Sequence, residues 1–293
     1  MTAVAAIAPA AIPFGPSMVQ VDIGGTSIEV YIYKPDMYRC ERMIMVFHGT
    51  LRNADEYRDH AAPMGDRFRA LIVAPKFDDE RFPYQRYHLG GILKEDGSAA
   101  ASEEWTFSMI PKLAGKIKEM EGKPDMPHYI IGHSAGGQFV MRMSGFVDTG
   151  AERIVSANPG THLFPTREMP YPYGLGGLPE PLSDDNALRR YLAQPLTVYL
   201  GTTDVIHGRY FPRGELAFKQ GDSRWERGFN NFNMAKKLAD ERGWEFNWTL
   251  VEARAIHHDH GDMFNHPICE IALFGRYGAL KTSDRRLEMP AER

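Results

Sequence analysis

The sequence contains few cysteines, no marked excess of charge of either sign and no long hydrophobic run. Its 293 residues include two cysteines, Cys40 and Cys269, too few for a disulfide framework. We expect two buried thiols, with one disulfide as the alternative. Lys and Arg total 34 and Asp and Glu total 38, which gives a formal net charge of -4. A nucleic-acid-binding protein is not expected, because binding to phosphates requires an excess of cations.

No stretch has the length and apolarity of a transmembrane helix, so we expect no membrane span. Residues 1–21 carry no charge, contain three prolines and lack the Lys or Arg that begins a secretory signal. We therefore expect a cytoplasmic protein, with export as the alternative if a signal has been removed. The predicted organisation is an N-terminal arm (1–17), a single domain (18–280) and a C-terminal tail (281–293).

Short β-rich runs alternate with longer helical stretches, which predicts an α/β protein. Alternating polar and apolar residues on both sides of Gly24-Gly25 predict an antiparallel hairpin over 18–23 and 28–33. Further strands are expected at 43–47, 70–74, 129–131, 154–157, 196–200 and 246–251. Helices are expected at 53–68, 102–120, 136–146, 184–192 and 230–242. The pattern is typical of a mostly parallel sheet with helices on both faces.

The region from about 161 to 194 interrupts this alternation. It begins with four prolines and a Gly-Leu-Gly-Gly run within twenty residues, and is too long for a simple connection. We expect a small cap excursion over a site, with a solvated excursion as the alternative.

The sharpest motif is Gly132-His133-Ser134-Ala135-Gly136, which matches G-x-S-x-G. It directly follows a predicted strand and directly precedes a predicted helix, the context in which this motif forms a nucleophile elbow. The turn would hold Ser134 in a strained conformation at the carboxyl edge of the sheet, where the helix N-terminus favours developing negative charge. Ser134 is therefore the predicted nucleophile.

With this elbow the chain resembles the α/β-hydrolase superfamily and is similar to bacterial polyhydroxybutyrate-depolymerase-like esterases. The resemblance runs from about Met43 to Phe274. It rests on Phe47-His48-Gly49-Thr50 with the Arg-Asn-Ala-Asp-Glu-Tyr that ends at Tyr57, on Gly132–Phe139, on Gln220–Gly228 and on His258-Asp259.

The resemblance implies an acid and then a histidine after the nucleophile in the chain. Asp204 follows the predicted strand 196–200 and is the expected acid. His258 is the expected base, with His257 and His260 as alternatives in the same loop. The oxyanion hole is expected to use the N–H of Ala135 and that of Thr50 or Leu51.

We also expect a substrate pocket lined by His48, Tyr87, Trp105 and His133, although His48 could instead brace its loop. The segment Gln220–Gly228 is predicted to support the loops of the acid and the histidine, with a charged, solvated loop as the alternative.

Together these features predict a serine hydrolase that cleaves a small-molecule or oligomeric ester without a cofactor or metal. An amidase, peptidase or thioesterase of the same fold and a non-catalytic binding relative remain alternatives. A metal hydrolase is disfavoured, because the histidine-rich stretch 257–262 lacks one ligand of the H-x-H-x-D-H pattern. A dehalogenase would carry Asp in place of Ser134. A homodimer is left open.

Overall fold

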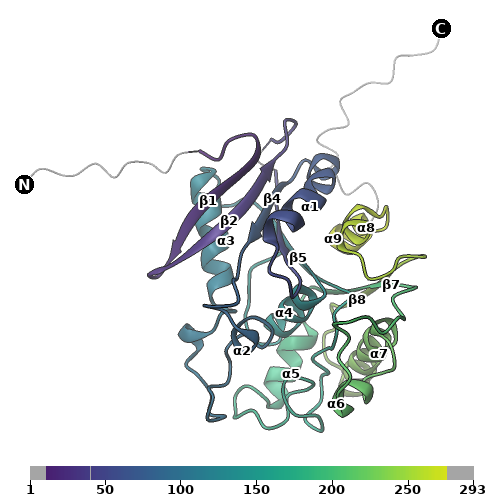
Figure 1. Ribbon diagram of the computed structural model, residues 1–293. Helices are drawn as coiled ribbons and strands as arrows, with labels where there is room; N and C mark the ends of the chain where they lie inside the picture. Colours follow the sequence, from purple (N-terminus) through teal and green to yellow (C-terminus); the bar gives the residue numbers. More distant parts are fainter. Residues whose placement is uncertain (1–10, 40, 276–293) are drawn as a thin grey trace, which may run out of the picture.

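The computed structural model describes residues 11–39 and 41–275, in which eight strands form one sheet. The strand order is β1-β2-β4-β3-β5-β6-β7-β8 (Figure 1). The hairpin β1–β2 is antiparallel, β2 pairs antiparallel with β4, and the other pairs are parallel. The strands are β1 (Gly15–Ile23), β2 (Thr26–Lys34), β3 (Met43–Phe47), β4 (Leu71–Pro75), β5 (His128–His133), β6 (Arg153–Ala157), β7 (Leu196–Gly201) and β8 (Thr249–Ala253). The predicted fold class is confirmed.

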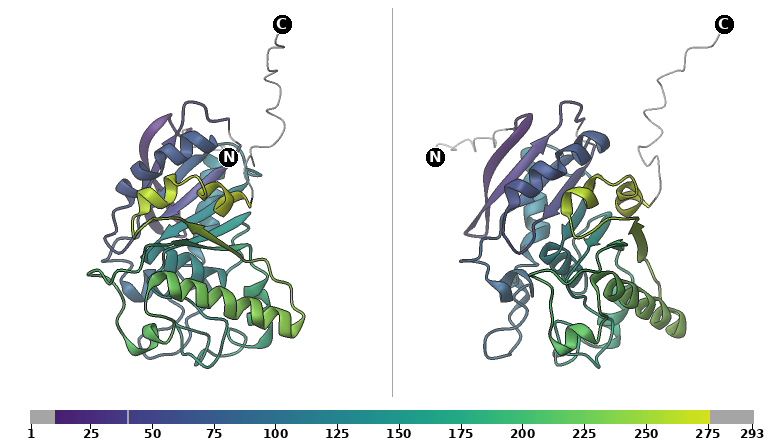
Figure 2. Two further views of the ribbon diagram at one scale, coloured as in Figure 1. Left: turned by 90° about the vertical axis from the view of Figure 1, so that its right-hand side faces the viewer. Right: turned by 45° about the vertical axis from the view of Figure 1, so that its right-hand side comes forward.

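Helices cover both faces of the sheet (Figures 1 and 2). One hydrophobic cluster joins α1 (Ala54–Phe68), α8 (His260–Asn265) and α9 (Cys269–Phe274) to one face. A second cluster joins α3 (Met109–Met120), α4 (Ala135–Ser144), α5 (Asp185–Leu192) and α7 (Arg224–Arg242) to the other. Alternate residues of β3 enter the two clusters, which explains why this strand is a continuous apolar run. The short helices are α2 (Tyr84–Tyr87), α6 (Glu215–Phe218) and the 3₁₀ turn Ser102–Glu104.

Several element boundaries differ from those expected. β1 begins at Gly15, so residues 15–17 of the expected arm are strand, and β8 begins three residues later than predicted. The helix expected from residue 102 begins at Met109. α7 begins at Arg224 and not at residue 230, because the side chain of Ser223 caps it by accepting a hydrogen bond from the N–H of Glu226. The expected tail, 281–293, lies outside the described residues.

The excursion over 161–194 is tied into the domain by buried side chains. Arg142 of α4 donates hydrogen bonds to the carbonyl oxygen of Pro172 and to the hydroxyl of Thr161. The side-chain amide of Gln220 bonds both the N–H and the carbonyl oxygen of His162. Residues 161–164 are all buried, so the start of this segment is packed into the domain, whereas residues 166–170 and 179–186 are exposed or partly exposed.

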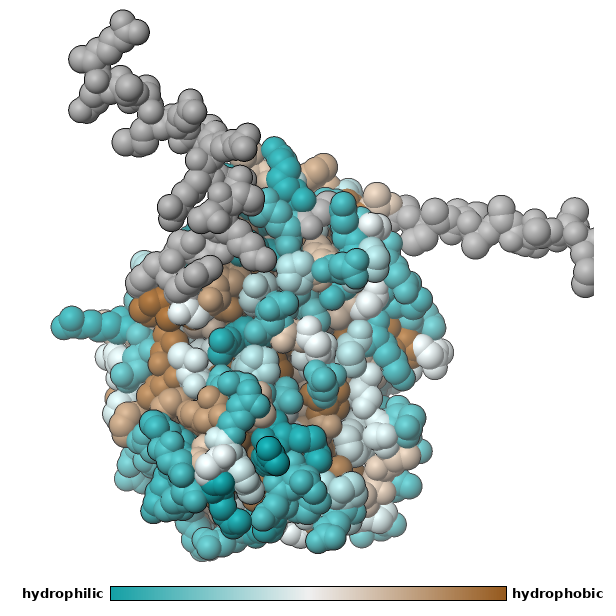
Figure 3. Space-filling view, turned by 180° about the vertical axis from the view of Figure 1, so that it is seen from behind, coloured by the Kyte–Doolittle hydropathy of each residue, from teal (hydrophilic) through white to brown (hydrophobic). Residues whose placement is uncertain are grey.

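The surface of the molecule seen from behind is mostly hydrophilic, with a strip of hydrophobic residues along its left side (Figure 3). Within residues 11–39 and 41–275, no helix has both the length and the apolarity to cross a membrane. Cys269 is a free thiol, and its burial raises its pKa to about 12. Cys40 lies outside the described residues.

Candidate active site

Ser134 occupies a tight turn between β5 and α4. Its φ of 57° and ψ of -114° are a conformation that side-chain-bearing residues adopt only under constraint. A Cβ on Gly132 would lie 2.2 Å from the carbonyl oxygen of Gly136, and one on Gly136 would lie 2.1 Å from that of Phe47. The two glycines are therefore required for the strand and the helix to approach each other, as the elbow motif predicts.

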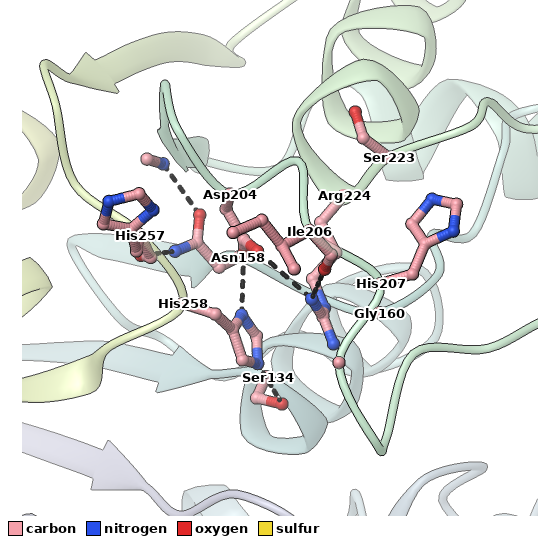
Figure 4. Close-up of polar contacts among 12 residues, drawn as sticks. Ser134, Asn158, Gly160, Asp204, Ile206, His207, Ser223, Arg224, His257 and His258 are labelled. Atoms are coloured by element: carbon pink, nitrogen blue, oxygen red, sulfur yellow. Dashed lines mark hydrogen bonds and ion pairs between the residues drawn. The ribbon is translucent and has the colours of Figure 1, made fainter.

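Three side chains from widely separated loops lie in line at the carboxyl ends of β5, β7 and β8 (Figure 4). His258 Nε2 lies 3.0 Å from Ser134 Oγ, and His258 Nδ1 lies 2.7 Å from Asp204 Oδ2. Asp204 is 2% exposed, whereas the side chain of His258 is 28% exposed. The structure thus brings together the predicted serine, histidine and acid in hydrogen-bonding order.

The other two histidines of the loop have different partners. His257 Nδ1 lies 3.1 Å from the carbonyl oxygen of Thr203. His260 stacks on Tyr57 with ring centroids 4.0 Å apart, and its Nε2 lies 2.8 Å from His60 Nδ1. Among the described residues, only His258 makes a hydrogen bond to the side chain of Ser134.

A second basic group holds the acid. Arg224 Nη1 lies 3.1 Å from Asp204 Oδ1, and the two side chains are 4% and 1% exposed. Burial lowers the pKa of Arg224, and the charge of Asp204 partly offsets this. Arg224 belongs to the segment Gln220–Gly228 that we expected to support the acid, and in the same segment Arg227 bonds the carbonyl oxygens of Gly160, Pro212 and Gly221.

Asn158, which sequence reasoning did not single out, supports the histidine loop. Its side-chain amide donates to the carbonyl oxygen of His257 at 3.2 Å and accepts from the N–H of Gly201 at 2.7 Å. It therefore joins the ends of β6 and β7 to the loop that carries His258. The backbone of Asn158 has a φ of 43° and marks an unusual turn. This turn lies in the Asn-Pro-Gly sequence that directly follows β6.

His133 lies under the ring of His258, with centroids 4.6 Å apart. It is 2% exposed, and Tyr57 Oη lies 3.3 Å from its Nδ1. Burial first, and then the charges of His258, His260 and Arg224, hold the pKa of His133 well below its usual value of 6.5. The histidine beneath His258 is therefore neutral and packs against it.

The loop after β3 reaches the nucleophile. A Cβ on Gly49 would lie 3.9 Å from Ser134 Cβ. The N–H groups of Thr50 and Leu51 have no backbone acceptor among the described residues, and the N–H of Ala135 lies in the first turn of α4, where such groups lack an intrahelical partner. His48 braces this loop, because its Nδ1 lies 3.0 Å from the carbonyl oxygen of Gly49 and its Nε2 accepts from the N–H of Phe77.

The cavity beside Ser134 has a volume of about 330 Å³ and is formed mainly by the segment that follows β7. Its lining residues are Ser134, Thr203, Asp204, Ile206, Gly208, Arg209, Tyr210, Arg224, His257 and His258. The excursion over 161–194 contributes none of them, so it does not cap this cavity.

The four residues that we expected to line a pocket lie elsewhere. Tyr87 is fully buried, stacks on His48 and donates a hydrogen bond to the carbonyl oxygen of His48. His133 is buried under His258. Trp105 lines a separate cavity of about 660 Å³, which is not the one beside Ser134. These aromatic side chains fill the core, which the sequence alone does not distinguish from a pocket.

Glu56, His60 and His260 have ligand atoms within 4.8 Å of one another and form the one described group that could hold a metal ion. However, the two imidazole nitrogens are 2.8 Å apart, a hydrogen-bond distance. Two nitrogens bound tetrahedrally to one zinc at about 2.05 Å would be roughly 3.3 Å apart. The group as it stands is therefore better described as a hydrogen-bonded histidine pair.

A scan against protein-family models and a search of curated proteins return no match. Solved structures do match. A poly(3-hydroxybutyrate) depolymerase from Bordetella parapertussis is 30% identical over 90% of this chain and 92% of its own, with a TM-score of 0.82. Poly(aspartic acid) hydrolase-1 from Sphingomonas sp. KT-1 is 32% identical over 86% and 96%, with a TM-score of 0.81.

An IroE-like serine hydrolase from Shewanella oneidensis, 12% identical with a TM-score of 0.52 over 85% of this chain and 77% of its own, shares the fold alone. The chain belongs to the α/β-hydrolase superfamily. Within it, the chain is similar to bacterial depolymerase-like hydrolases, as the resemblance implied.

Proposed function

We propose that this protein hydrolyses carboxylic esters through an acyl-enzyme intermediate, with Ser134 as the nucleophile, His258 as the base and Asp204 as the orienting acid. The observation that carries the proposal is the line of hydrogen bonds from Ser134 Oγ through His258 to Asp204. A buried carboxylate on Nδ1 leaves Nε2 of a neutral imidazole free to accept the serine proton.

In the proposed reaction, Ser134 Oγ attacks the ester carbonyl carbon while His258 Nε2 takes its proton. The oxyanion binds the N–H of Ala135 and that of Thr50 or Leu51, and Asp204 stabilises the imidazolium. His258 then protonates the departing alcohol as the acyl-enzyme forms. Water, deprotonated by the same histidine, attacks this ester and releases the acid and Ser134. Apart from the substrate and this water, the proposed steps use only groups of the chain.

The substrate class is proposed from the neighbours and from the cavity. A cavity of about 330 Å³ suits a short acyl or hydroxyacyl unit, and the 30%-identical neighbour is a depolymerase of a polyester. We therefore propose an oligomeric ester as the substrate. Amide hydrolysis is the second candidate, because the 32%-identical neighbour acts on poly(aspartic acid), whose units are joined by amide bonds.

The test uses a serine-directed organophosphate, peptide mapping, and turnover of one activated ester. Ser134 should be labelled stoichiometrically, and Ser134→Ala should lower the turnover by about four to six decades. The matched control is Ser144→Ala, which alters the last residue of α4, a serine whose hydroxyl donates to the carbonyl oxygen of Met141; this variant should still be labelled at Ser134. Labelling at another residue, or a Ser134→Ala variant with full turnover, would contradict the proposal.

The histidine assignment is tested separately. His258→Gln should abolish turnover, whereas His257→Gln and His260→Gln should keep a measurable rate, because their side chains bond Thr203 and His60 and not Ser134. The value of kcat/KM of the wild type should fall on the acid side, since a protonated imidazole cannot accept the serine proton. An inactive His257→Gln or His260→Gln beside an active His258→Gln would show that the base is a different histidine.

A further inference from the structure

The cavity beside Ser134 carries an excess of positive charge. Its lining includes two arginines, Arg209 and Arg224, and one carboxylate, Asp204. That carboxylate is already bonded on one oxygen by His258 and on the other by Arg224. A substrate that enters the cavity therefore meets cationic groups that Asp204 does not fully neutralise.

Arg224 has hydrogen-bonding capacity that the protein does not use. Of its guanidinium nitrogens, only Nη1 has acceptors among the described residues, on Asp204 and the carbonyl oxygen of Ile206. Its Nε is buried without a partner, although the side chain lines the cavity. Figure 4 shows one nitrogen of this guanidinium joined by dashed lines to Asp204 and Ile206, and another nitrogen without a dashed line. Arginine presents its five N–H donors in a fixed fork that matches a carboxylate.

Hydrogen bonds and ring stacking hold the segment that carries Arg209. Arg213 donates hydrogen bonds to the carbonyl oxygens of His207 and Gly208, and the ring of His207 stacks on Phe211 at 4.1 Å. Arg209 itself is exposed, and its guanidinium lies 5.3 Å from the centroid of the Tyr210 ring. Among the described residues, no acidic group pairs with Arg209, so its charge is available at the cavity.

We propose that the cavity recognises a carboxylate on the substrate, with the unbonded edge of Arg224 and the guanidinium of Arg209 as the anion-binding groups. The preferred substrates are then esters that carry a carboxylate a few carbons from the scissile bond, such as the acid-terminated ends of hydroxy-acid oligomers. This inference rests on the proposed ester hydrolysis at Ser134 and names its substrate class.

The chemical reason is the loss of water when the substrate enters. A neutral ester displaces water and leaves the donors of Arg224 without an acceptor, whereas a carboxylate supplies two charged acceptor oxygens. Ile206 and Tyr210 line the same cavity and can contact the carbon chain between the carboxylate and the ester. Asp204 keeps its own bond to Nη1, so binding of the carboxylate does not require the acid to leave His258.

The test compares two matched pairs of substrates. One is the linear dimer of 3-hydroxybutanoic acid with a free carboxylate, against the same dimer with a terminal carboxamide. The other is mono-4-nitrophenyl adipate against 4-nitrophenyl hexanoate, which places the carboxylate on the acyl side. We expect kcat/KM for the anionic member to exceed that for the neutral member about tenfold in at least one pair at low salt. The ratio should fall as salt screens the exposed Arg209.

Three variants assign the effect to residues. Arg209→Gln should lower the anionic-to-neutral ratio of kcat/KM only about two- to fivefold, because Arg209 is exposed and its charge is screened. Arg209→Glu should lower this ratio further, because it places a negative charge at the same position. Arg224→Lys, which keeps a cation for Asp204 but loses the fork, should raise KM more for the anionic than for the neutral member. Arg254→Gln is the matched control, because it removes an equal charge from an exposed position that does not line the cavity.

This inference would be overturned if Ser134-dependent hydrolysis showed no preference for the anionic member of either pair. The proposed function would then still stand, because neutral esters would be hydrolysed at Ser134. A ratio that falls equally in Arg209→Gln and Arg254→Gln would also overturn it, because the effect would then be one of net charge. Failure of the wild type on every ester, without labelling of Ser134, would instead overturn the proposed function.

Discussion

Mild acid should destabilise this protein strongly, because five of its histidines are buried in the neutral form. His48, His88, His128, His133 and His162 are each at most 7% exposed. Burial lowers the pKa to about 3 for His48, His88 and His162 and to about 4 for His128. It holds that of His133 well below 6.5.

The surroundings of these histidines do not stabilise the protonated form of the ring. One ring nitrogen each of His88, His133 and His162 is buried without a hydrogen-bond partner among the described residues. The guanidinium of Arg142 further lowers the pKa of both His88 and His162. Protonation inside the fold would therefore bury a charge next to another cation.

The sign of the effect follows from proton binding in the two states. Each histidine has a pKa near 6.5 in the unfolded chain, so below that pH the unfolded state binds more protons than the folded state. The stability that these histidines confer is complete above about pH 6.5 and is lost as the pH falls toward the folded-state values. At pH 5.5 the loss is about 1.4 kcal/mol for each of the four histidines with a pKa of about 3 or 4, or about 6 kcal/mol for the four, and His133 adds to it. A typical domain has only about 5–15 kcal/mol in total.

The assay is urea unfolding followed by tryptophan fluorescence at a series of pH values from 8.5 to 5. The midpoint should stay constant from pH 8.5 to 7.5, where none of the five titrates, and should fall steeply below pH 6.5. In His128→Leu the free energy of unfolding should fall less steeply with pH, by about 1.4 kcal/mol per pH unit, because one fewer proton is bound on unfolding. A midpoint at pH 5.5 within the error of that at pH 7.5, or an unchanged slope in His128→Leu, would refute the reasoning.

Three further predictions concern the elbow, the acid and the metal. Gly136→Ala should cost at least about 3 kcal/mol of unfolding free energy, since its Cβ would lie 2.1 Å from the carbonyl oxygen of Phe47. Gly115→Ala in α3, where the Cβ meets nothing within 4 Å, should stabilise the protein by about 0.5–1 kcal/mol, and equal effects of the two in thermal unfolding would contradict the packing argument. Arg224→Met should lower the unfolding free energy by about 3–5 kcal/mol, because it leaves the buried Asp204 without its cation; a urea midpoint equal to that of the wild type would count against this. Hydrolysis should survive prolonged dialysis against a strong chelator, without stoichiometric zinc by elemental analysis, and activity lost on chelation and restored by added metal would disprove this expectation.

The sheet could be predicted from the sequence because its parallel strands are buried on both faces. Continuous apolar runs such as those of β3 and β4 are typical of strands that have a hydrophobic layer on each face. Helix boundaries depend on single capping side chains, so the sequence predicts where a helix begins less well than it predicts the strands. The early start of α7 follows from Ser223 and Glu226, a capping-box pattern that is visible in the sequence, although the helix was expected only from residue 230.

Ser134 was recognisable because its chemistry is local. The elbow needs small residues within two positions of the serine, and the flanking strand and helix are adjacent in the chain. Asp204 and His258 were accessible for a related reason, since each follows a strand and all parallel strands of one sheet end at the same edge. The choice among His257, His258 and His260 required the resemblance, because side-chain direction in a loop has no periodicity.

The cavity was not predictable, because its wall comes from contacts between segments that are distant in the chain. Arg224 reaches Asp204 across 20 positions, and Asn158 reaches the carbonyl of His257 across 99. Neither pairing leaves a pattern in composition or spacing. By residue type, Tyr87 is as good a candidate for a pocket wall as Tyr210. Their burial distinguishes them, because Tyr87 is 0% exposed and fills the core, whereas Tyr210 is 53% exposed and lines the cavity. In this chain a side chain contacts the cavity because its loop follows β7 next to Ser134, and residue type alone carries no such information.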